Sequence, residues 1–349
     1  MSSNNFGLGI IGCGNISDTH AEAIIHSEQG NLVAAHSRTK SNLDAFCEQY
    51  EIEGSTSYDE FLTVPGLDAV SICTPSGTHL DYGKQAAEAG KHVIVEKPIE
   101  VSVQRGRELI DSCSENGVKL AVIYQNRFID EIVDMKKALD TGKIGNPILA
   151  SASVRWYRSQ EYYNDSDWRG TLALDGGGVV INQSIHTVDL LYWLIGEVES
   201  VSALKGTFTH PDIEAEDTAV ACLQFKNGAI GVFEGSTSIR PPQKRRIEVN
   251  GSKGTALLEG DSFHLQLEGD QQEAPLENED EAAGAASPLD GMSVINHQRQ
   301  FERIFKAFAS GGEAVVSGEE SLKSLAIVEA IYRASDRNKL VQVDSILNQ

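Results

Sequence analysis

The chain has 349 residues, with 51 acidic and 29 basic side chains and a formal net charge of −22. A field of this sign repels nucleic-acid phosphates and anionic membrane surfaces, so neither is expected as a partner. No apolar run approaches the roughly 20 residues that span a bilayer, and the N-terminus lacks the basic and apolar regions of a signal peptide. We therefore expect a cytoplasmic protein.

The N-terminal stretch 8–20 has the order of a strand, a glycine turn and a helix. Gly12 allows a tight turn after the apolar run 8–11, and Gly14 lets the backbone approach a pyrophosphate at the helix N-terminus. Ser17 stands where the dinucleotide-binding pattern has its third glycine, and it is small enough for close packing. The stretch predicts a dinucleotide site, with a plain glycine turn as the alternative.

Short apolar strands alternate with helices up to residue 124. After the first strand, further strands are expected at 31–36, 67–73, 91–95 and 118–124, with helices at 16–28, 40–50, 80–89 and 101–115. This alternation predicts a parallel doubly wound sheet, a Rossmann domain over 1–126. Polar residues follow the strand ends, where such sheets bind ligands: Ser37 and Arg38, Thr74 through His79, Glu96 and Lys97, and Gln125 through Arg127.

The residue after the second strand contacts the adenosine ribose in such folds. An acidic side chain there favours NAD, whereas the guanidinium of Arg38 suits the 2′-phosphate of NADP. Arginine also stacks on adenine in NAD enzymes. The sequence favours NADP and leaves NAD open.

The pattern changes near residue 145. After a helix at 129–141, strands follow one another with hairpin turns, at 147–157, 198–208, 217–225, 229–237, 244–249, 255–258 and 263–267. They predict an α+β domain over 127–349 with a large antiparallel or mixed sheet. The acidic segment 269–291 is expected to be a surface excursion. Helices are expected at 294–310 and 318–337, and the C-terminal tail can pack back on the first domain.

Two motifs carry the chemistry. Lys97 follows the fourth strand, where a lysine donates to a substrate oxygen and holds a developing alkoxide; a surface pair with Glu96 is the alternative. In the second motif, 175–193, three glycines remove side chains where a backbone must approach a ligand or another strand. His186 can take a hydroxyl proton, with a structural histidine as the alternative.

A helix is expected to follow the glycines, with Asn182, His186, Asp189 and Trp193 on one face. Asp189 would orient the ring of His186 or cap local backbone. The preceding loop 156–171 is rich in aromatic and hydrogen-bonding groups, which suits a polyol; an interface loop is the alternative. The five cysteines form no C-x-x-C pair and no H-E-x-x-H motif occurs, so we expect no disulfide and no metal.

Four motifs in this order resemble the Gfo/Idh/MocA oxidoreductase family over nearly the whole chain. They are the glycine turn 9–16, Cys73-Thr-Pro75 through His79, Glu96-Lys97-Pro98, and Gly176-Gly-Gly through His186-x-x-Asp189. The resemblance implies hydride transfer between a nicotinamide dinucleotide, NAD or NADP, and a carbon of a sugar, polyol or sugar derivative. It also implies that the second domain, with its open sheet, serves substrate binding and oligomerisation, and that the protein forms a homodimer or homotetramer through this sheet.

The resemblance makes Lys97 and His186 the catalytic pair. The expected cofactor ligands combine residues that the resemblance implies with residues that follow the strand ends. They are Gly12, Gly14, Asn15, Ile16, Ser37, Arg38, Thr74, Pro75, His79, Glu96, Lys97 and Gln125. The expected substrate ligands are Lys97, Arg127, Trp168, Arg169, Asn182 and His186.

One position departs from the family pattern. Many members have Asp where this chain has Asn182, and an amide cannot act as a base, so proton transfer falls to His186. The Asn-Gln-x-x-His variant is similar to the subset that handles nucleotide-linked amino sugars, which favours NAD and conflicts with Arg38. Two other functions stay open: a glycosidase that oxidises its sugar transiently with bound NAD, and a non-catalytic dinucleotide-binding sensor.

Overall fold

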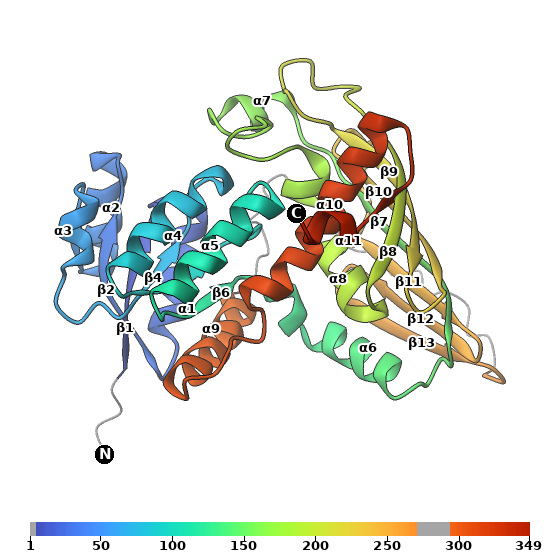
Figure 1. Ribbon diagram of the computed structural model, residues 1–349, viewed down its shortest axis with the longest axis horizontal. Coiled ribbons are helices and arrows are strands. Elements are labelled where there is room, and N and C mark those ends of the chain that lie inside the picture. The colour runs from blue at the N-terminus through green and yellow to red at the C-terminus, as the bar shows by residue number, and fades with distance from the viewer. Residues whose placement is uncertain (1–4, 271–293) are drawn as a thin grey trace. The chain divides into compact units, whose positions relative to one another are not determined.

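The structure is a computed structural model that describes residues 5–270 and 294–349 (Figure 1). By its contacts the chain divides into a first unit, residues 1–128 with 291–322, and a second unit, residues 129–290 with 323–349. The functional division at residue 126/127 stays a prediction. The acidic segment 269–291 lies, from residue 271 on, outside the described residues.

The first unit contains a parallel sheet of six strands in the order β3-β2-β1-β4-β5-β6. This confirms the predicted doubly wound sheet. The short edge strand β3 was missed, because its three residues, Glu-Gly-Ser, carry no apolar pattern. The strands are β1 (Phe6–Ile11), β2 (Gly30–His36), β3 (Glu53–Ser55), β4 (Ala69–Ile72), β5 (His92–Val95) and β6 (Leu120–Val122).

Helices flank this sheet, and one of them comes from far along the chain. Right-handed crossovers place α1 and α2 on one face and α4 and α5 on the other. Helix α9 packs against α1 and buries Phe301 and Phe305 completely in the core. The helices are α1 (Asn15–Ile25), α2 (Lys40–Tyr50), α3 (Tyr58–Leu62), α4 (His79–Glu88), α5 (Val103–Glu115) and α9 (Val294–Ala309), with 3₁₀ turns at Ser76–Thr78 and Gln125–Phe128.

The second unit contains a sheet of eight strands in the order β13-β12-β11-β7-β10-β9-β8-β14. Strands β7 and β10 pair in parallel, and the other described pairings are antiparallel. The predicted mixed, largely antiparallel sheet is therefore confirmed. The strands are β7 (Pro147–Arg155), β8 (Val198–Gly206), β9 (Thr218–Phe225), β10 (Ile230–Ser236), β11 (Arg246–Gly251), β12 (Gly254–Glu259), β13 (Ser262–Leu267) and β14 (Val341–Gln342).

One face of this sheet is covered and the other is open. Helices α6 (Asp130–Asp140) and α8 (Ile185–Ile195) pack on the covered face. Buried and exposed residues alternate along β9 and β10, as expected for strands with one buried face. Three short or terminal helices complete the unit: α7 (Gln160–Asn164), the larger part of α10 (Gly318–Arg337), and α11 (Asp344–Leu347).

Within the described parts of the chain, no helix combines the length and apolar character needed to cross a bilayer. All five cysteines are free thiols. The cytoplasmic location expected from the sequence stays a prediction.

Candidate active site

The glycine turn after β1 leaves room at the N-terminus of α1. Gly12 has a φ of +91°, and a Cβ there would lie 2.9 Å from Thr74 Cγ2. Gly14 precedes the helix with extended backbone and no side-chain cap, and a Cβ at Gly14 would meet open space. The backbone N–H groups of Asn15 and Ile16 at this terminus fit the pyrophosphate of a nicotinamide dinucleotide.

Two residues after β2 are the expected contacts for the adenosine end. Ser37 is buried and its hydroxyl accepts the backbone N–H of Thr39 at 3.3 Å. Arg38 is exposed. The nearby ammonium of Lys40 lies 2.8 Å from both carboxylate oxygens of Asp44. The cofactor roles of Ser37 and Arg38 stay predictions.

The Glu96-Lys97-Pro98 turn after β5 is held from inside. Glu96 is buried, its Oε1 lies 2.8 Å from His20 Nε2, and its Oε2 accepts the backbone N–H of Lys97 at 3.0 Å. His79 is also buried, with Nδ1 3.0 Å from the Pro98 carbonyl and Nε2 3.0 Å from the Thr74 carbonyl. Burial lowers the pKa of His79. Glu96 and His79 therefore hold the two turns that follow β4 and β5, where the cofactor is predicted to bind.

Two further predicted ligands follow β6. Gln125 and Arg127 are 6% and 4% exposed. The guanidinium of Arg127 forms an ion pair with Glu320 at 2.9 Å. This pairing gives Arg127 a structural partner in the first unit, and the ligand roles of both residues stay predictions.

The glycine triplet of the second unit approaches a neighbouring segment. A Cβ at Gly178 would overlap the carbonyl oxygen of Glu216, and a Cβ at Gly177 would overlap the hydroxyl of Tyr332. The Glu216 carboxylate accepts the N–H groups of Gly178 at 3.2 Å and Val180 at 2.9 Å, and the Tyr332 hydroxyl at 3.0 Å. Burial outweighs these bonds and raises the pKa of Glu216.

The expectation of one continuous helix carrying residues 182–193 is wrong. Val179–Gln183 forms a π-helical turn, and α8 begins only at Ile185. The wider turn changes the register, so Asn182 does not continue the α-helical face of His186. Asp189 is buried on α8 and accepts the Ser324 hydroxyl at 2.7 Å.

A buried carboxylate holds the amide of Asn182. Asp175 Oδ1 accepts from Asn182 Nδ2 at 2.6 Å, and Asp175 Oδ2 accepts the backbone N–H of Gly170 at 2.8 Å. Asn182 Oδ1 in turn accepts from Gln183 Nε2 at 2.7 Å. The chain thus has a carboxylate next to the position where many Gfo/Idh/MocA members carry one.

The loop before the glycine triplet gathers two arginines on aromatic rings. The Arg158 guanidinium lies 5.3 Å from the ring centroid of Trp156 and 5.5 Å from that of Tyr162. The Arg169 guanidinium lies 4.4 Å from the Tyr162 centroid and 5.5 Å from that of Trp168. Gln183 joins them, since it accepts from Arg158 Nε at 3.2 Å and donates to the Tyr162 hydroxyl at 2.9 Å. The loop therefore places Arg158 and Arg169 on aromatic rings beside Gln183, whose amide bonds Asn182.

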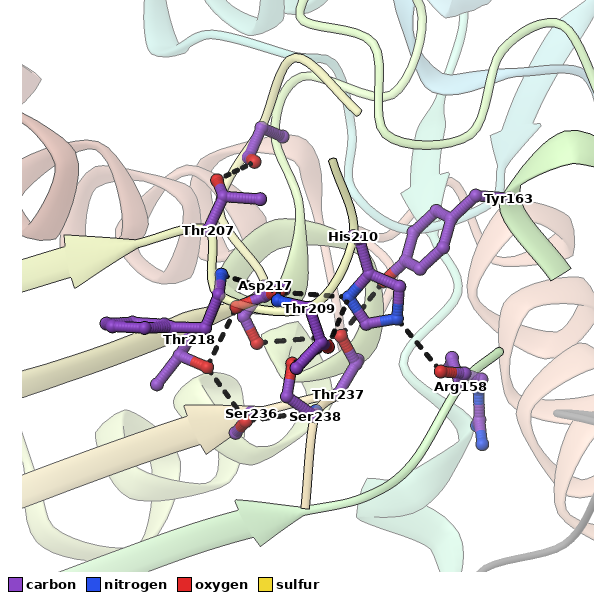
Figure 2. Close-up of polar contacts among 12 residues, drawn as sticks. Arg158, Tyr163, Thr207, Thr209, His210, Asp217, Thr218, Ser236, Thr237 and Ser238 are labelled. Carbon is purple, nitrogen blue, oxygen red and sulfur yellow. Dashed lines mark hydrogen bonds and ion pairs between the residues drawn. The ribbon is translucent and has the colours of Figure 1, made fainter. Parts of the chain in front are cut away.

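A polar cluster fastens this loop to the sheet, as Figure 2 shows. His210 is buried, with Nδ1 3.0 Å from Asp217 Oδ2 and Nε2 2.9 Å from the Arg158 carbonyl. The Tyr163 hydroxyl lies 3.0 Å from Thr237 Oγ1. Sequence reasoning missed this cluster, and nothing in the local pattern around His210 indicates it.

Comparison with known proteins agrees with this architecture. Residues 6–124 match the model of an oxidoreductase family with an NAD-binding Rossmann fold, and residues 132–257 match the GFO/IDH/MocA C-terminal domain. The scyllo-inositol 2-dehydrogenase (NAD(+)) of Bacillus subtilis is 31% identical over 257 residues, covering 71% of this chain and 72% of that protein. The oxidoreductase YrbE of the same organism is 32% identical, covering 72% and 73%.

The chain belongs to the Gfo/Idh/MocA oxidoreductase family. The WlbA dehydrogenase of Bordetella pertussis, whose structure contains NADH and UDP-GlcNAcA, is 31% identical, with 97% and 98% of the two chains covered and a TM-score of 0.86. This Gfo/Idh/MocA protein is thus a nicotinamide-dependent oxidoreductase that acts on the CH–OH group of a sugar, polyol or sugar derivative.

Asn182→Asp is expected to make stability depend on pH. It brings a second carboxyl group within hydrogen-bond distance of buried Asp175, and one member of such a pair has a raised pKa. A carboxyl group whose pKa is higher in the folded protein than in the unfolded chain makes its full contribution to stability only below the unfolded-state pKa. The loss of stability in Asn182→Asp therefore grows as pH rises from about 4 to 8. Thermal unfolding should show a loss of about 1–3 kcal/mol at pH 8 and a smaller loss at pH 5.

The matched control is Asn182→Ala, which removes the amide without adding a charge. Its stability deficit should be nearly the same at both pH values. Equal deficits for Asn182→Asp at pH 5 and pH 8 would contradict the Asp175 contact as the cause.

Proposed function

We propose that this protein oxidises a hydroxyl-bearing carbon of a nucleotide-linked sugar that carries a carboxylate, with NAD as hydride acceptor. The observation that carries the proposal is the Asn182-Gln183 amide pair bonded to a loop with two ring-stacked arginines. The WlbA dehydrogenase, 31% identical over almost the whole chain and bound to NADH and UDP-GlcNAcA, supports it.

The two guanidinium groups of this loop favour an anionic group in the substrate. A protein with a net charge of −22 repels anions at long range. Arg158 and Arg169 provide two guanidinium groups within one short segment, and guanidinium binds carboxylate and phosphate through paired hydrogen bonds. Three acids lie in the same loop, so a carboxylate or diphosphate in the substrate is supported by the local geometry of the two arginines and by the UDP-GlcNAcA in the WlbA structure.

The roles of the reacting groups follow from their chemistry. A bound nicotinamide dinucleotide would supply the hydride acceptor, the C4 atom of its ring. His186 takes the hydroxyl proton as the carbon is oxidised to a ketone. Lys97 donates a hydrogen bond to the same oxygen and stabilises its developing negative charge. Asn182, held by Asp175, hydrogen-bonds a neighbouring substrate group.

Lys97→Met and His186→Ala are each expected to lower kcat at least 100-fold, because general acid–base groups contribute roughly 10²–10⁴-fold. The assay is NADH formation from NAD with UDP-GlcNAcA, and with UDP-N-acetylglucosamine, which lacks the sugar carboxylate, as the comparison. UDP-GlcNAcA should give the higher kcat/KM, since only it carries the carboxylate.

His264→Ala is the control, because His264 is an exposed histidine on β13 of the second unit, and its kcat should match the wild type. Wild-type turnover by both Lys97→Met and His186→Ala would refute the assigned roles. Release of UDP without net NADH formation would indicate the elimination chemistry of an NAD-dependent glycosidase and not net oxidation.

The cations available near Arg38 decide between NAD and NADP. Binding of a 2′-phosphate dianion is helped by more than one cation. Arg38 supplies one cation, but the next basic residue, Lys40, already pairs with both carboxylate oxygens of Asp44. We therefore assign Arg38 to stacking on adenine and propose NAD rather than the NADP that the sequence alone favours.

Calorimetric titration with NADH and NADPH should show NADH bound about tenfold more tightly, a difference of about 1.4 kcal/mol. Arg38→Ala should weaken both cofactors to a similar extent, because stacking does not distinguish them. Tighter binding of NADPH that Arg38→Ala abolishes would restore the assignment of Arg38 to a 2′-phosphate.

The open face of the eight-stranded sheet supports a homodimer or homotetramer. Ile230 and Val232 on β10 are 58% and 39% exposed, and Val220 on β9 is 43% exposed. Exposed apolar side chains gathered on one face are typical of association surfaces. Light scattering after size exclusion should give a multiple of the monomer mass, and Val232→Glu should shift it toward monomer; a monomeric wild type would contradict the proposal.

A further inference from the structure

A single buried carboxylate connects α1 to the backbone of Lys97. His20 Nε2 lies 2.8 Å from Glu96 Oε1, while Glu96 Oε2 accepts the Lys97 N–H at 3.0 Å. The His20 side chain is fully buried and that of Glu96 is 9% exposed. The position of the imidazole therefore determines where this carboxylate holds the turn.

The surroundings of His20 fix its ring. Its Nδ1 lies 2.8 Å from Ser71 Oγ on β4 and 3.3 Å from Cys73 Sγ. The ring of Phe301 meets it edge-on with centroids 5.3 Å apart, and the ring of His297 lies 5.5 Å away. With both nitrogens engaged and aromatic rings alongside, His20 has one orientation, and that orientation directs Nε2 at Glu96.

The charges of the pair support each other. Burial disfavours the charged form of His20, but Cys73 and Glu96 outweigh it and raise the pKa of His20 to about 10. Burial likewise opposes ionisation of Glu96, yet His20, Lys97 and His297 lower the pKa of Glu96 to about 2. Near neutral pH the contact is an imidazolium donating to a carboxylate, and such charge-assisted bonds are short and strong.

The same side chains also offer metal ligands. Ligand atoms of His20, Glu96 and His297 lie within 4.8 Å of one another in the described part of the chain. A metal would require a neutral His20 and would have to break the 2.8 Å bond to Glu96. Because both ring nitrogens of His20 already lie within 2.8 Å of Ser71 and Glu96, the geometry favours a hydrogen-bonded pair over a metal centre.

We propose that His20 is a positioning residue, which through Glu96 fixes the backbone of Lys97 and so directs the lysine ammonium at the substrate oxygen. This inference rests on the role of Lys97 in the proposed function. On the far side of Lys97, His79 bonds the Pro98 carbonyl at 3.0 Å, so the backbone is held on both sides. Small misplacements of a catalytic group cost as much as about 100-fold in rate.

Two substitutions of His20 separate positioning from general stability. In His20→Gln the amide nitrogen lies near the place of Nε2 and still donates to Glu96, whereas in His20→Asn it lies near the place of Nδ1 and reaches only Ser71. We expect His20→Asn to lower kcat about 10–100-fold with KM and the NADH dissociation constant within about threefold of wild type. His20→Gln should recover most of that kcat.

The control is His92→Asn, the same change at a half-buried histidine at the start of β5, whose Nδ1 accepts the Lys119 N–H at 3.0 Å. Its kcat should stay at the wild-type value. Equal loss of kcat in His20→Gln and His20→Asn, or a loss that appears in KM and cofactor binding alone, would overturn the positioning role.

Lys97→Met, measured alongside, distinguishes a failure of the role assigned to Lys97 from a failure of the role assigned to His20. An active Lys97→Met refutes the role of Lys97 in the proposed function, while an inactive Lys97→Met with a fully active His20→Asn refutes only the role of His20. If His20→Asn does not fold, Glu96→Gln replaces it, with a lowered kcat and unchanged KM expected and a wild-type kcat contradicting the inference. Dialysis against EDTA should leave kcat unchanged, and a loss that zinc restores would replace the pair with a metal site.

Discussion

Buried carboxylates that accept backbone N–H groups support the turns of both units. Glu96 accepts the N–H of Lys97, Asp175 accepts that of Gly170, and Glu216 and Asp217 each accept two more. A turn buried away from water must satisfy its N–H groups, because each unpaired one costs a free energy comparable to a lost hydrogen bond. An ionised oxygen is the strongest acceptor for this purpose.

This use of acids places part of the chain's negative charge inside the protein, where each carboxylate has a specific partner. Glu96 is compensated by His20, and Asp217 lies 3.0 Å from His210 Nδ1. Glu216 is different, because its partners are neutral N–H and hydroxyl groups and burial raises its pKa. The arginines of the aromatic loop lie over rings, Arg158 over Trp156 and Arg169 over Tyr162, and Gln183 links Arg158 to Asn182.

The sequence predicted the regular parts of the fold well, for local reasons. Apolar runs bounded by glycine and proline identified the parallel strands of the first unit, and hairpin turns identified the strands of the second. Strand β3 was too short and polar to show a pattern. The π-helical turn at Val179–Gln183 was missed because periodicity assumes a uniform 3.6 residues per turn, and the turn is widened where Glu216 accepts the N–H groups of Gly178 and Val180.

By itself the sequence determined the fold class and the glycine turn for a dinucleotide, while the reacting roles of Lys97 and His186, implied by the family resemblance, stay predictions. These depend on residue types and spacings within a dozen positions, where propensity and side-chain chemistry act directly. Only the tertiary structure decided that His20 meets Glu96 across 76 positions, and that His210 meets the Arg158 carbonyl across 52. Such pairs form because strands and helices that pack together bring distant side chains into one buried space, and no local pattern records which of many polar residues will meet there.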